Sequence, residues 1–224
     1  MSLRGGKLIV LDGTDGAGKT TQINLLSGWL KKKNIPYEVI SFPRYGQNKY
    51  ARLVKKYLAG EYGSIQKADP YKIAKYYAGD RLLAKSLINS WLKEGKVVLA
   101  NRYVSSNKAH MGANLPAKER EKFFKWLDKL EYETNSIPKE DLTILLVVDP
   151  QVGQSNVLGK QKPDLHEASL EHLKQANKIY LQLAKSEPNW VVVNCMKDGK
   201  MRPKEDIHRE CIQQLKSSFM QLRS

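Results

Sequence analysis

The sequence predicts an α/β fold in which helices cover both faces of a parallel sheet. Two observations support this prediction. Short apolar runs rich in branched residues alternate with longer stretches of helical periodicity, a pattern typical of parallel sheets enclosed by helices. A glycine-rich loop also follows the first apolar run and opens a helical stretch. With 224 residues the chain is long enough to bury a core, and we expect a single domain over residues 1–224 because no linker divides it.

Five segments are predicted as strands because each is short, apolar and rich in Val, Ile or Leu. They are residues 7–12, 37–42, 96–100, 142–148 and 190–194. Near-continuous apolar character, rather than strict alternation, is typical of strands that are covered on both faces. These five strands would form the central layer of the fold.

Helices are predicted for the stretches between and after the strands. They are residues 18–33, 47–59, 70–94, 117–134, 167–186 and 204–222. In the third helix the large apolar residues lie on or near one stripe, as expected of an amphipathic helix. These are Ile73, Tyr77, Leu82, Leu83, Leu87 and Trp91. Residues 153–167 are polar and contain glycine and proline, which predicts a flexible lid over a site.

The charge balance favours small anionic ligands. The formal net charge is +15, but the lysines are scattered, which indicates a solvated basic surface rather than a nucleic-acid track. No apolar run approaches the ~20 residues of a membrane helix, and the N-terminus has no apolar signal core. Cys195 and Cys211 are too few for a disulfide framework. We therefore expect a cytoplasmic protein without nucleic-acid or membrane partners.

The motif Gly13-x-x-x-x-Gly18-Lys19-Thr20 is a P-loop in its expected strand–loop–helix context. Its backbone N–H groups would surround phosphate oxygens, and the helix N-terminus would add partial positive charge. Lys19 would reach the outer phosphates of a bound nucleotide, and the Thr20 hydroxyl would bind Mg²⁺. The predicted nucleotide-binding residues are Gly13, Thr14, Asp15, Gly16, Ala17, Gly18, Lys19, Thr20 and Thr21.

Four further motifs give the chain a resemblance to thymidylate kinases. They are "FPRYG" at 42–46, "YYAGDR" at 76–81, "NRYVSSNKAH" at 101–110 and "DLHE" at 164–167. The resemblance implies a three-layer P-loop kinase fold with a five-stranded parallel sheet and a small mobile lid. It also implies transfer of a phosphoryl group from ATP to dTMP in dTTP biosynthesis, with Mg²⁺, by a homodimer.

The chemistry of such a transfer can be stated from the residues. The acceptor phosphate is largely a dianion at neutral pH, since its second pKa is about 6, so no general base is needed. Repulsion between donor and acceptor phosphates must instead be offset by cations. Lys19, Arg44 and Arg102 are the candidates, because the two arginines follow strands and ligands bind at strand ends in open α/β sheets. Each arginine could also form an ordinary surface or structural ion pair.

The resemblance also implies an acceptor pocket. Its residues are Asp15, Phe42, Pro43, Arg44, Tyr77, Arg81, Arg102, Ser106, Asn107, His110 and Glu167. Tyr77 and Arg81 lie four residues apart on one helix, where a ring and a guanidinium suit a pyrimidine. Tyr77 would stack on the base, Arg81 would bind its O4 and Asn107 its N3. Core packing for Tyr77 and helix capping for Asn107 remain alternatives.

At three other positions the sequence allows two roles for the side chain. Asp15 would contact the 3′-hydroxyl of the acceptor sugar, or bond its own backbone as a turn aspartate. His110 stands where relatives carry a tyrosine that rejects ribonucleotides, and a surface histidine is the alternative. Glu167 would orient acceptor contacts, or stabilise a helix N-terminus.

Two departures from the family pattern concern catalysis. Asn101 replaces the usual acidic residue; its carbonyl oxygen can join a Mg²⁺ shell but brings no charge, so weaker Mg²⁺ binding is expected. Gly16 stands where many relatives carry a catalytic P-loop arginine, and the lid offers only Lys160 and Lys162. We expect one of these lysines to close over the phosphoryl group. A kinase for another nucleoside monophosphate and a catalytically weakened nucleotide-binding protein are the alternative functions.

Overall fold

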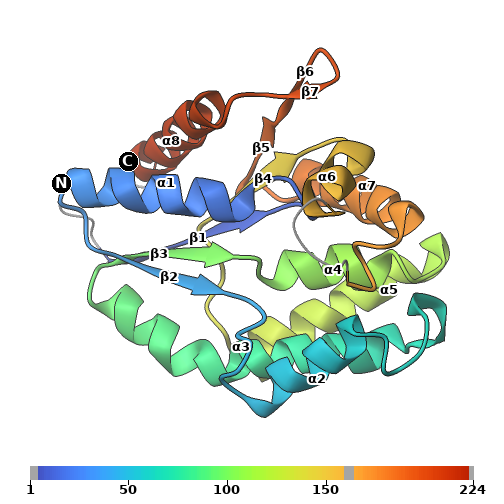
Figure 1. Ribbon diagram of the computed structural model, residues 1–224. Helices are drawn as coiled ribbons and strands as arrows, with labels where there is room; N and C mark the ends of the chain where they lie inside the picture. Colours follow the sequence, from blue (N-terminus) through green and yellow to red (C-terminus); the bar gives the residue numbers. More distant parts are fainter. Residues whose placement is uncertain (1–4, 159–163, 222–224) are drawn as a thin grey trace.

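The computed structural model describes residues 5–158 and 164–221. A five-stranded parallel sheet with the order β2-β3-β1-β4-β5 lies at its centre (Figure 1). The strands are β1 (Lys7–Asp12), β2 (Tyr37–Ser41), β3 (Val97–Asn101), β4 (Leu142–Val147) and β5 (Trp190–Asn194). Because Leu11 pairs in register with Asn101, the loops that follow β1 and β3 leave the sheet side by side. Ligands bind at this edge in open α/β folds.

Helices enclose the sheet, as expected from the sequence. They are α1 (Lys19–Lys32), α2 (Lys49–Leu58), α3 (Pro70–Lys93), α4 (Val104–Gly112), α5 (Ala117–Asp128), α6 (Pro150–Leu158), α7 (Leu170–Ser186) and α8 (Lys204–Gln221). Short elements are the 3₁₀ turn η1 (Ile65–Lys67), the π-helical turn η2 (Lys129–Thr134) and the hairpin β6 (Met196–Lys197) and β7 (Lys200–Met201). The predicted strands and helices are confirmed to within a few residues, although η2 ends the fourth predicted helix.

Alternating strand residues divide the core into two layers. Ile9 and Leu11 of β1 pack with residues of α1 and α8 on one face of the sheet. Leu8 and Val10 pack with residues of α3, α4 and α5 on the other face. Figure 1 shows the same division, with α1 and α8 above the sheet and α2 and α3 below it. Both faces of every central strand are therefore covered, which explains their continuous apolar runs.

Two helices occupy segments that the sequence did not indicate as helical. Residues 104–112 form α4 directly after β3, and residues 150–158 form α6, which includes the first part of the expected lid. The Asp149 carboxylate starts α6 by accepting from the backbone N–H of Gln151 at 2.8 Å. Gly153 then packs against the P-loop, with Gly16 as its neighbour. The glycine of α6 therefore serves a contact between this helix and the P-loop.

The apolar stripe expected on α3 is split between the core and the surface. Ile73 is 2% exposed, whereas Leu82, Leu83 and Leu87 are 39%, 53% and 44% exposed. The face of α3 that packs inward carries Ala84 and Ile88 together with buried polar residues. Three leucines on one helix are therefore left uncovered.

None of the described helices has both the length and the apolar character that crossing a bilayer requires.

Candidate active site

The P-loop follows β1, and its glycines are required by close backbone contacts. Gly13 has a φ of +134°, and a Cβ there would lie 2.3 Å from the Leu146 carbonyl oxygen. Gly16 has a φ of +77°, and a Cβ there would lie 1.9 Å from the Gly153 carbonyl oxygen. The contact with α6 thus excludes any side chain at position 16 in this arrangement. This explains why the chain has no P-loop arginine.

The beginning of α1 is prepared for an anion. Its N-cap is Gly18, and no described side chain caps the first-turn N–H groups, so these donors can bind phosphate oxygens. The Lys19 ammonium donates to the carbonyl oxygens of Gly13 and Thr14, each at 2.9 Å. Burial and the nearby Arg102 charge lower the pKa of Lys19 to about 8. Lys19 is therefore held inside the loop that it would serve.

Two cavities meet beside the P-loop. The donor cavity, about 560 Å³, is lined by residues 15–22 and by α6, the β6–β7 hairpin and α8. The acceptor cavity, about 430 Å³, is lined by the end of β2, α3, α4 and residues 164–167. Six residues line both cavities: Asp15, Thr20, Phe42, Asn101, Arg102 and Glu167. Gly13 and Thr14 do not line the donor cavity, but their carbonyl oxygens hold Lys19. A group passing from one cavity to the other would pass these shared residues.

Arg102 lies at this junction. Its φ of +66° is in the left-handed region, which costs a non-glycine residue about 1 kcal/mol or more. Its guanidinium pairs with Asp15 and donates to the Ser106 hydroxyl at 3.2 Å. Burial alone would raise the pKa of Asp15, but the charges of Arg102 and Lys19 lower it to about 2. The Asp15 carboxylate keeps the pKa of Arg102 high against burial, so the pair is fully charged at neutral pH.

Asp12, the last residue of β1, holds this region together although sequence reasoning did not select it. Its buried carboxylate accepts from the Gly13 N–H at 2.9 Å, the Ser106 hydroxyl at 2.7 Å and the Tyr180 hydroxyl at 2.6 Å. These bonds join the P-loop, α4 and α7. An acidic residue closing an apolar strand just before a P-loop was the available sequence signal.

Arg44 is fixed by Asp80 of α3. Its backbone N–H and its Nε donate to the Asp80 carboxylate at 2.7 and 2.9 Å. Asn48 donates to the same carboxylate at 2.6 Å. Arg44 does not line the acceptor cavity, although its neighbour Pro43, after a cis peptide bond, does. Asp80 belongs to the "YYAGDR" motif and was missed, because its role depends on a residue 36 positions away.

Four residues predicted for the base and sugar line the acceptor cavity: Asp15, Tyr77, Asn107 and His110. Asn107 does not cap α4, because it lies inside the helix and its Nδ2 donates to the Ala74 carbonyl at 3.1 Å. His110 is buried and is therefore not a surface histidine. Tyr77 is partly buried and packs against the core on this side of the sheet, so it combines packing with exposure to the cavity.

Arg81 requires a correction. The structure does not bring it to the acceptor cavity, and its side chain is 1% exposed. Its Nε donates to the Glu131 carboxylate at 2.9 Å, and its Nη1 donates to the Tyr103 carbonyl at 3.2 Å. Tyr77 and Arg81 lie on the same side of α3 but about 6 Å apart along its axis, so Tyr77 reaches the cavity while the Arg81 side chain ends at Glu131 of η2. In this structure Arg81 forms a buried ion pair, and we do not assign it to the base.

The segment after the expected lid lines the acceptor cavity. Glu167 accepts from the Asp164 N–H at 2.9 Å rather than stabilising α7, whose N-cap is Ser169. Burial and the charge of Glu167 raise the pKa of Asp164 to about 6. Lys160 and Lys162 lie outside the described residues. The donor cavity also contains residues that the sequence analysis missed, among them Asn156, Met201 and Arg202.

Thr20 and Asn101 fit a hard cation. The Asn101 Nδ2 lies 3.4 Å from the Thr20 hydroxyl, and the Asn101 Oδ1 is a buried oxygen without a hydrogen-bond partner among the described residues. Oxygen ligands of this kind suit Mg²⁺, which usually keeps several waters and the substrate phosphates in its shell. The two residues could therefore supply protein contacts to Mg²⁺ at the junction.

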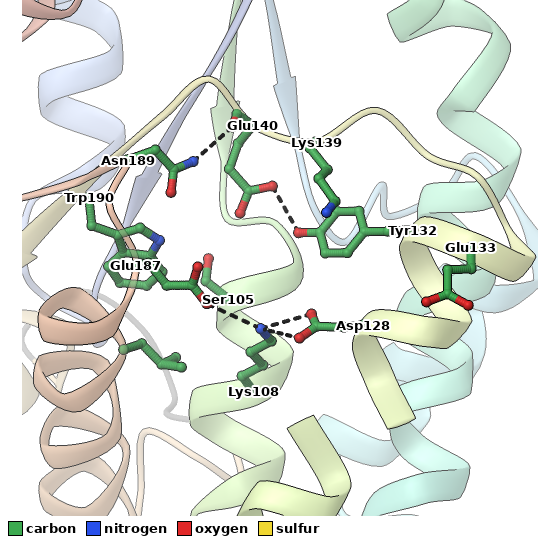
Figure 2. Close-up of a pocket in the computed structure, with 11 residues that line it drawn as sticks. Ser105, Lys108, Asp128, Tyr132, Glu133, Lys139, Glu140, Glu187, Asn189 and Trp190 are labelled. Atoms are coloured by element: carbon green, nitrogen blue, oxygen red, sulfur yellow. Dashed lines mark hydrogen bonds and ion pairs between the residues drawn. The ribbon is translucent and has the colours of Figure 1, made fainter. Parts of the chain in front are cut away.

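A further cavity, about 350 Å³, does not belong to this site. It lies beside α4, η2 and the start of β5, and Figure 2 shows its Lys108 between Asp128 and Glu187. Among the described residues, four acidic side chains and two lysines line it: Asp128, Glu133, Glu140, Glu187, Lys108 and Lys139. This charge balance disfavours a polyanion, and no predicted site residue within the described part of the chain lines the cavity.

The sheet, the P-loop and the paired cavities define a P-loop kinase. A sequence model of the family described as thymidylate kinase matches residues 11–210. The chain is 30% identical over 194 residues to the thymidylate kinase of Mycobacterium tuberculosis, covering 83% of this chain and 90% of that one. It is 33% identical over 202 residues to that of Cutibacterium acnes, covering 88% and 92%. The chain belongs to the thymidylate kinase family.

A solved structure shows the same fold. The thymidylate kinase of Candida albicans superposes with a TM-score of 0.72 at 19% identity, over 96% of this chain and 94% of that one.

Proposed function

We propose that this chain transfers the γ-phosphoryl group of ATP to dTMP in an in-line reaction that uses Mg²⁺. The observation that carries the proposal is the junction of a P-loop cavity with a second polar cavity at Arg102 and Asp15. Family membership supports ATP as donor and dTMP as acceptor. Tyr77 and Asn107 in the acceptor cavity offer a ring and an amide to a pyrimidine.

The chain's own cationic side chains would offset most of the repulsion between the donor and acceptor phosphates. Phosphate charges about 4 Å apart repel by about 4 kcal/mol per pair at an effective dielectric of about 20. Lys19 would turn from the P-loop carbonyls to the outer phosphates of ATP, and Arg102 would lie between donor and acceptor. Mg²⁺ held near Thr20 and Asn101 would neutralise charge that develops on the phosphates.

A coupled assay tests the proposal directly. With ATP and Mg²⁺, ADP production is expected to be fastest with dTMP when dTMP, dUMP, dCMP and dGMP are compared side by side. Faster turnover of another monophosphate would assign a different acceptor. ATP binding without ADP production would identify a catalytically weakened nucleotide-binding protein.

Replacing Asn101 by aspartate is expected to lower the Mg²⁺ concentration for half-maximal activity severalfold. The reason is that a carboxylate adds charge at a position where the amide oxygen now offers only a dipole. The measurement is a Mg²⁺ titration of kcat at saturating nucleotides, with Asn101→Ala as the control expected to move half-saturation upward. Identical Mg²⁺ curves for all three proteins would remove Asn101 from the metal site, while excess EDTA should stop turnover in each.

We also propose that two copies of the chain form a homodimer through α3. Leu82, Leu83 and Leu87 are exposed on this helix, and a partner would remove them from water.

A cytoplasmic location agrees with Cys195 and Cys211, which are buried and not joined in a disulfide.

Replacing Leu83 and Leu87 together by glutamate is expected to convert the dimer to a monomer. Two charges would be buried without partners if the interface formed. Light scattering after size-exclusion chromatography at micromolar concentration measures the mass. Val39→Glu, at another exposed apolar residue, serves as the matched control and should leave the mass unchanged. A double variant with the wild-type dimer mass would place the interface elsewhere.

A further inference from the structure

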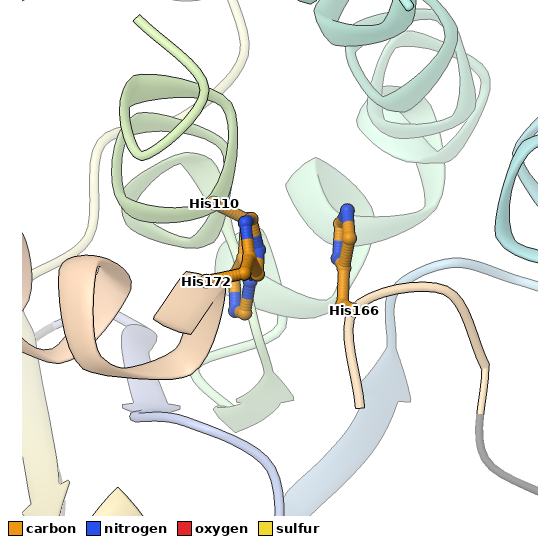
Figure 3. A group of neighbouring side chains, drawn as sticks. All are labelled: His110, His166 and His172. Carbon is orange, nitrogen blue, oxygen red and sulfur yellow. The ribbon is translucent and has the colours of Figure 1, made fainter. Parts of the chain in front are cut away.

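Three histidines from separate elements meet beside the acceptor cavity. Figure 3 shows His110 of α4, His172 of α7 and His166 from the loop before α7 facing one another. All three are buried, and one nitrogen from each lies within 4.8 Å of the others. Their ring centroids are 4.4 to 5.4 Å apart, and their planes differ by only 6° to 29°.

The arrangement does not suit a shared metal ion. His166 stacks on His172 with ring centroids 4.4 Å apart, so the lone pairs in these two ring planes lie side by side rather than pointing to one centre. His110 instead meets His172 edge to edge, and a hydrogen bond occupies their facing nitrogens. The rings also have other partners, since the His166 Nε2 lies 2.8 Å from the Tyr57 hydroxyl. The three histidines therefore form hydrogen bonds with neighbouring side chains rather than a metal site.

Two of the histidines continue a chain of hydrogen bonds that begins at Arg102. The Arg102 Nη1 lies 3.2 Å from the His110 Nε2, and the His110 Nδ1 lies 3.2 Å from the His172 Nε2. The His172 Nδ1 lies 3.0 Å from the Asn114 Oδ1. The chain thus runs from the junction of the cavities to the loop after α4.

The direction of this chain is set by its first member. A guanidinium has only donors, so the His110 Nε2 must accept and the neutral ring must carry its proton on Nδ1. That N–H donates to the His172 Nε2, which leaves the His172 proton on Nδ1. The second N–H donates to the Asn114 Oδ1. Each ring therefore has one permitted tautomer.

We propose that His110, His172 and Asn114 form a one-way hydrogen-bond chain that holds the Arg102 guanidinium between the two cavities during phosphoryl transfer. His172 and Asn114 line neither cavity and act through His110 as positioning residues. The proposal deepens the proposed function and rests on the role given there to Arg102.

This series of hydrogen bonds can form only while the rings of His110 and His172 are both neutral. A proton on the His110 Nε2 would face Arg102 and break the first bond. The groups that face the two rings are Arg102, Lys19, Asp15, His166 and Tyr180. Burial and the neighbouring Arg102 charge hold the pKa of His110 well below its usual range, and burial lowers that of His172 to about 4. Both rings therefore stay neutral through the physiological range.

The tautomers can be read without any activity measurement. Long-range ¹H–¹⁵N NMR of the full-length protein at pH 7 is expected to show His110 and His172 as neutral rings protonated on Nδ1. A proton on Nε2 of either ring would contradict the proposed direction of the hydrogen bonds, whether or not the protein is an active kinase.

A matched pair of substitutions at His172 tests the positioning role. His172→Phe keeps a flat ring against His166 but removes the acceptor, and kcat is expected to fall about tenfold to a hundredfold because Arg102 is misplaced. His172→Gln keeps an acceptor near the position of Nε2 and should retain kcat within about threefold. The KM for ATP should change little in both variants, and their thermal midpoints show whether each is folded.

Three kinetic outcomes overturn the proposal. They are a folded His172→Phe variant with wild-type kcat, equal losses in both His172 variants, and a change confined to KM. Arg102→Ala, assayed in the same way, tests the catalytic role of Arg102 on which the proposal depends. Wild-type kcat in Arg102→Ala would refute the role of Arg102 itself, independently of the tautomers.

Asn114→Asp adds a pH test. A carboxylate at the end of the chain would favour protonated His172, whose Nε2–H would then reverse the bond to His110. The pKa of His172, followed by the same NMR measurement, is expected to rise by about one unit or more from its wild-type value of about 4. An unchanged His172 pKa in the folded variant would contradict the proposed series of hydrogen bonds.

Discussion

Arg102→Ala is expected to lower kcat by about a hundredfold to a thousandfold, the usual effect of removing a preorganised donor from the reacting group. The guanidinium lies where the donor and acceptor cavities meet, and Asp15 keeps it charged by holding its pKa high despite burial. The backbone of Arg102, which is in the left-handed region, is fixed by a hydrogen bond from its N–H to the Leu11 carbonyl oxygen at 3.0 Å. The charge therefore stands in place before substrates arrive.

Arg102→Lys is the matched control for this prediction. A lysine keeps the charge but loses the planar fork that bonds Asp15, Ser106 and His110 together, so its kcat should fall between those of wild type and alanine. Steady-state assays with ATP and dTMP measure kcat, and thermal unfolding shows that the variants are folded. An alanine variant within threefold of wild-type kcat would contradict the assignment.

Arg81→Met is expected to destabilise the protein by about 3 to 5 kcal/mol, because it leaves Glu131 buried without its partner. Arg81 and Glu131 are 1% and 0% exposed, and the pair links α3 to η2. Urea unfolding followed by circular dichroism measures the loss. The double replacement Arg81→Met with Glu131→Leu should recover most of the stability, since no uncompensated charge remains.

The same variant separates the two interpretations of Arg81. A residue that binds the base O4 would raise the KM for dTMP when it is replaced, and would leave the free energy of unfolding nearly unchanged. A residue that belongs to a buried ion pair would change stability first. An Arg81→Met protein as stable as wild type, with a raised KM for dTMP, would restore the base-binding role.

Local patterns made much of the fold predictable. The strands and the P-loop depend on neighbours within a few residues, since branched runs, Gly13, Gly18 and Lys19 act through their own backbone. The elements that were missed lacked such a pattern. The segment forming α4 is polar and fully buried, and α6 contains a glycine that exists for its contact with Gly16. Both helices depend on what packs against them.

The sequence by itself determined the class of chemistry: a strand, a phosphate loop, a helix and a set of motifs shared with a kinase family. Only the tertiary structure decided which side chains meet. It turned Tyr77 toward the acceptor cavity and Arg81 toward Glu131, left Leu83 in solvent, and joined His110 to His172 across 62 positions. The physical reason is that a backbone conformation follows from nearby residues, whereas the partner of a side chain is set by packing between distant elements.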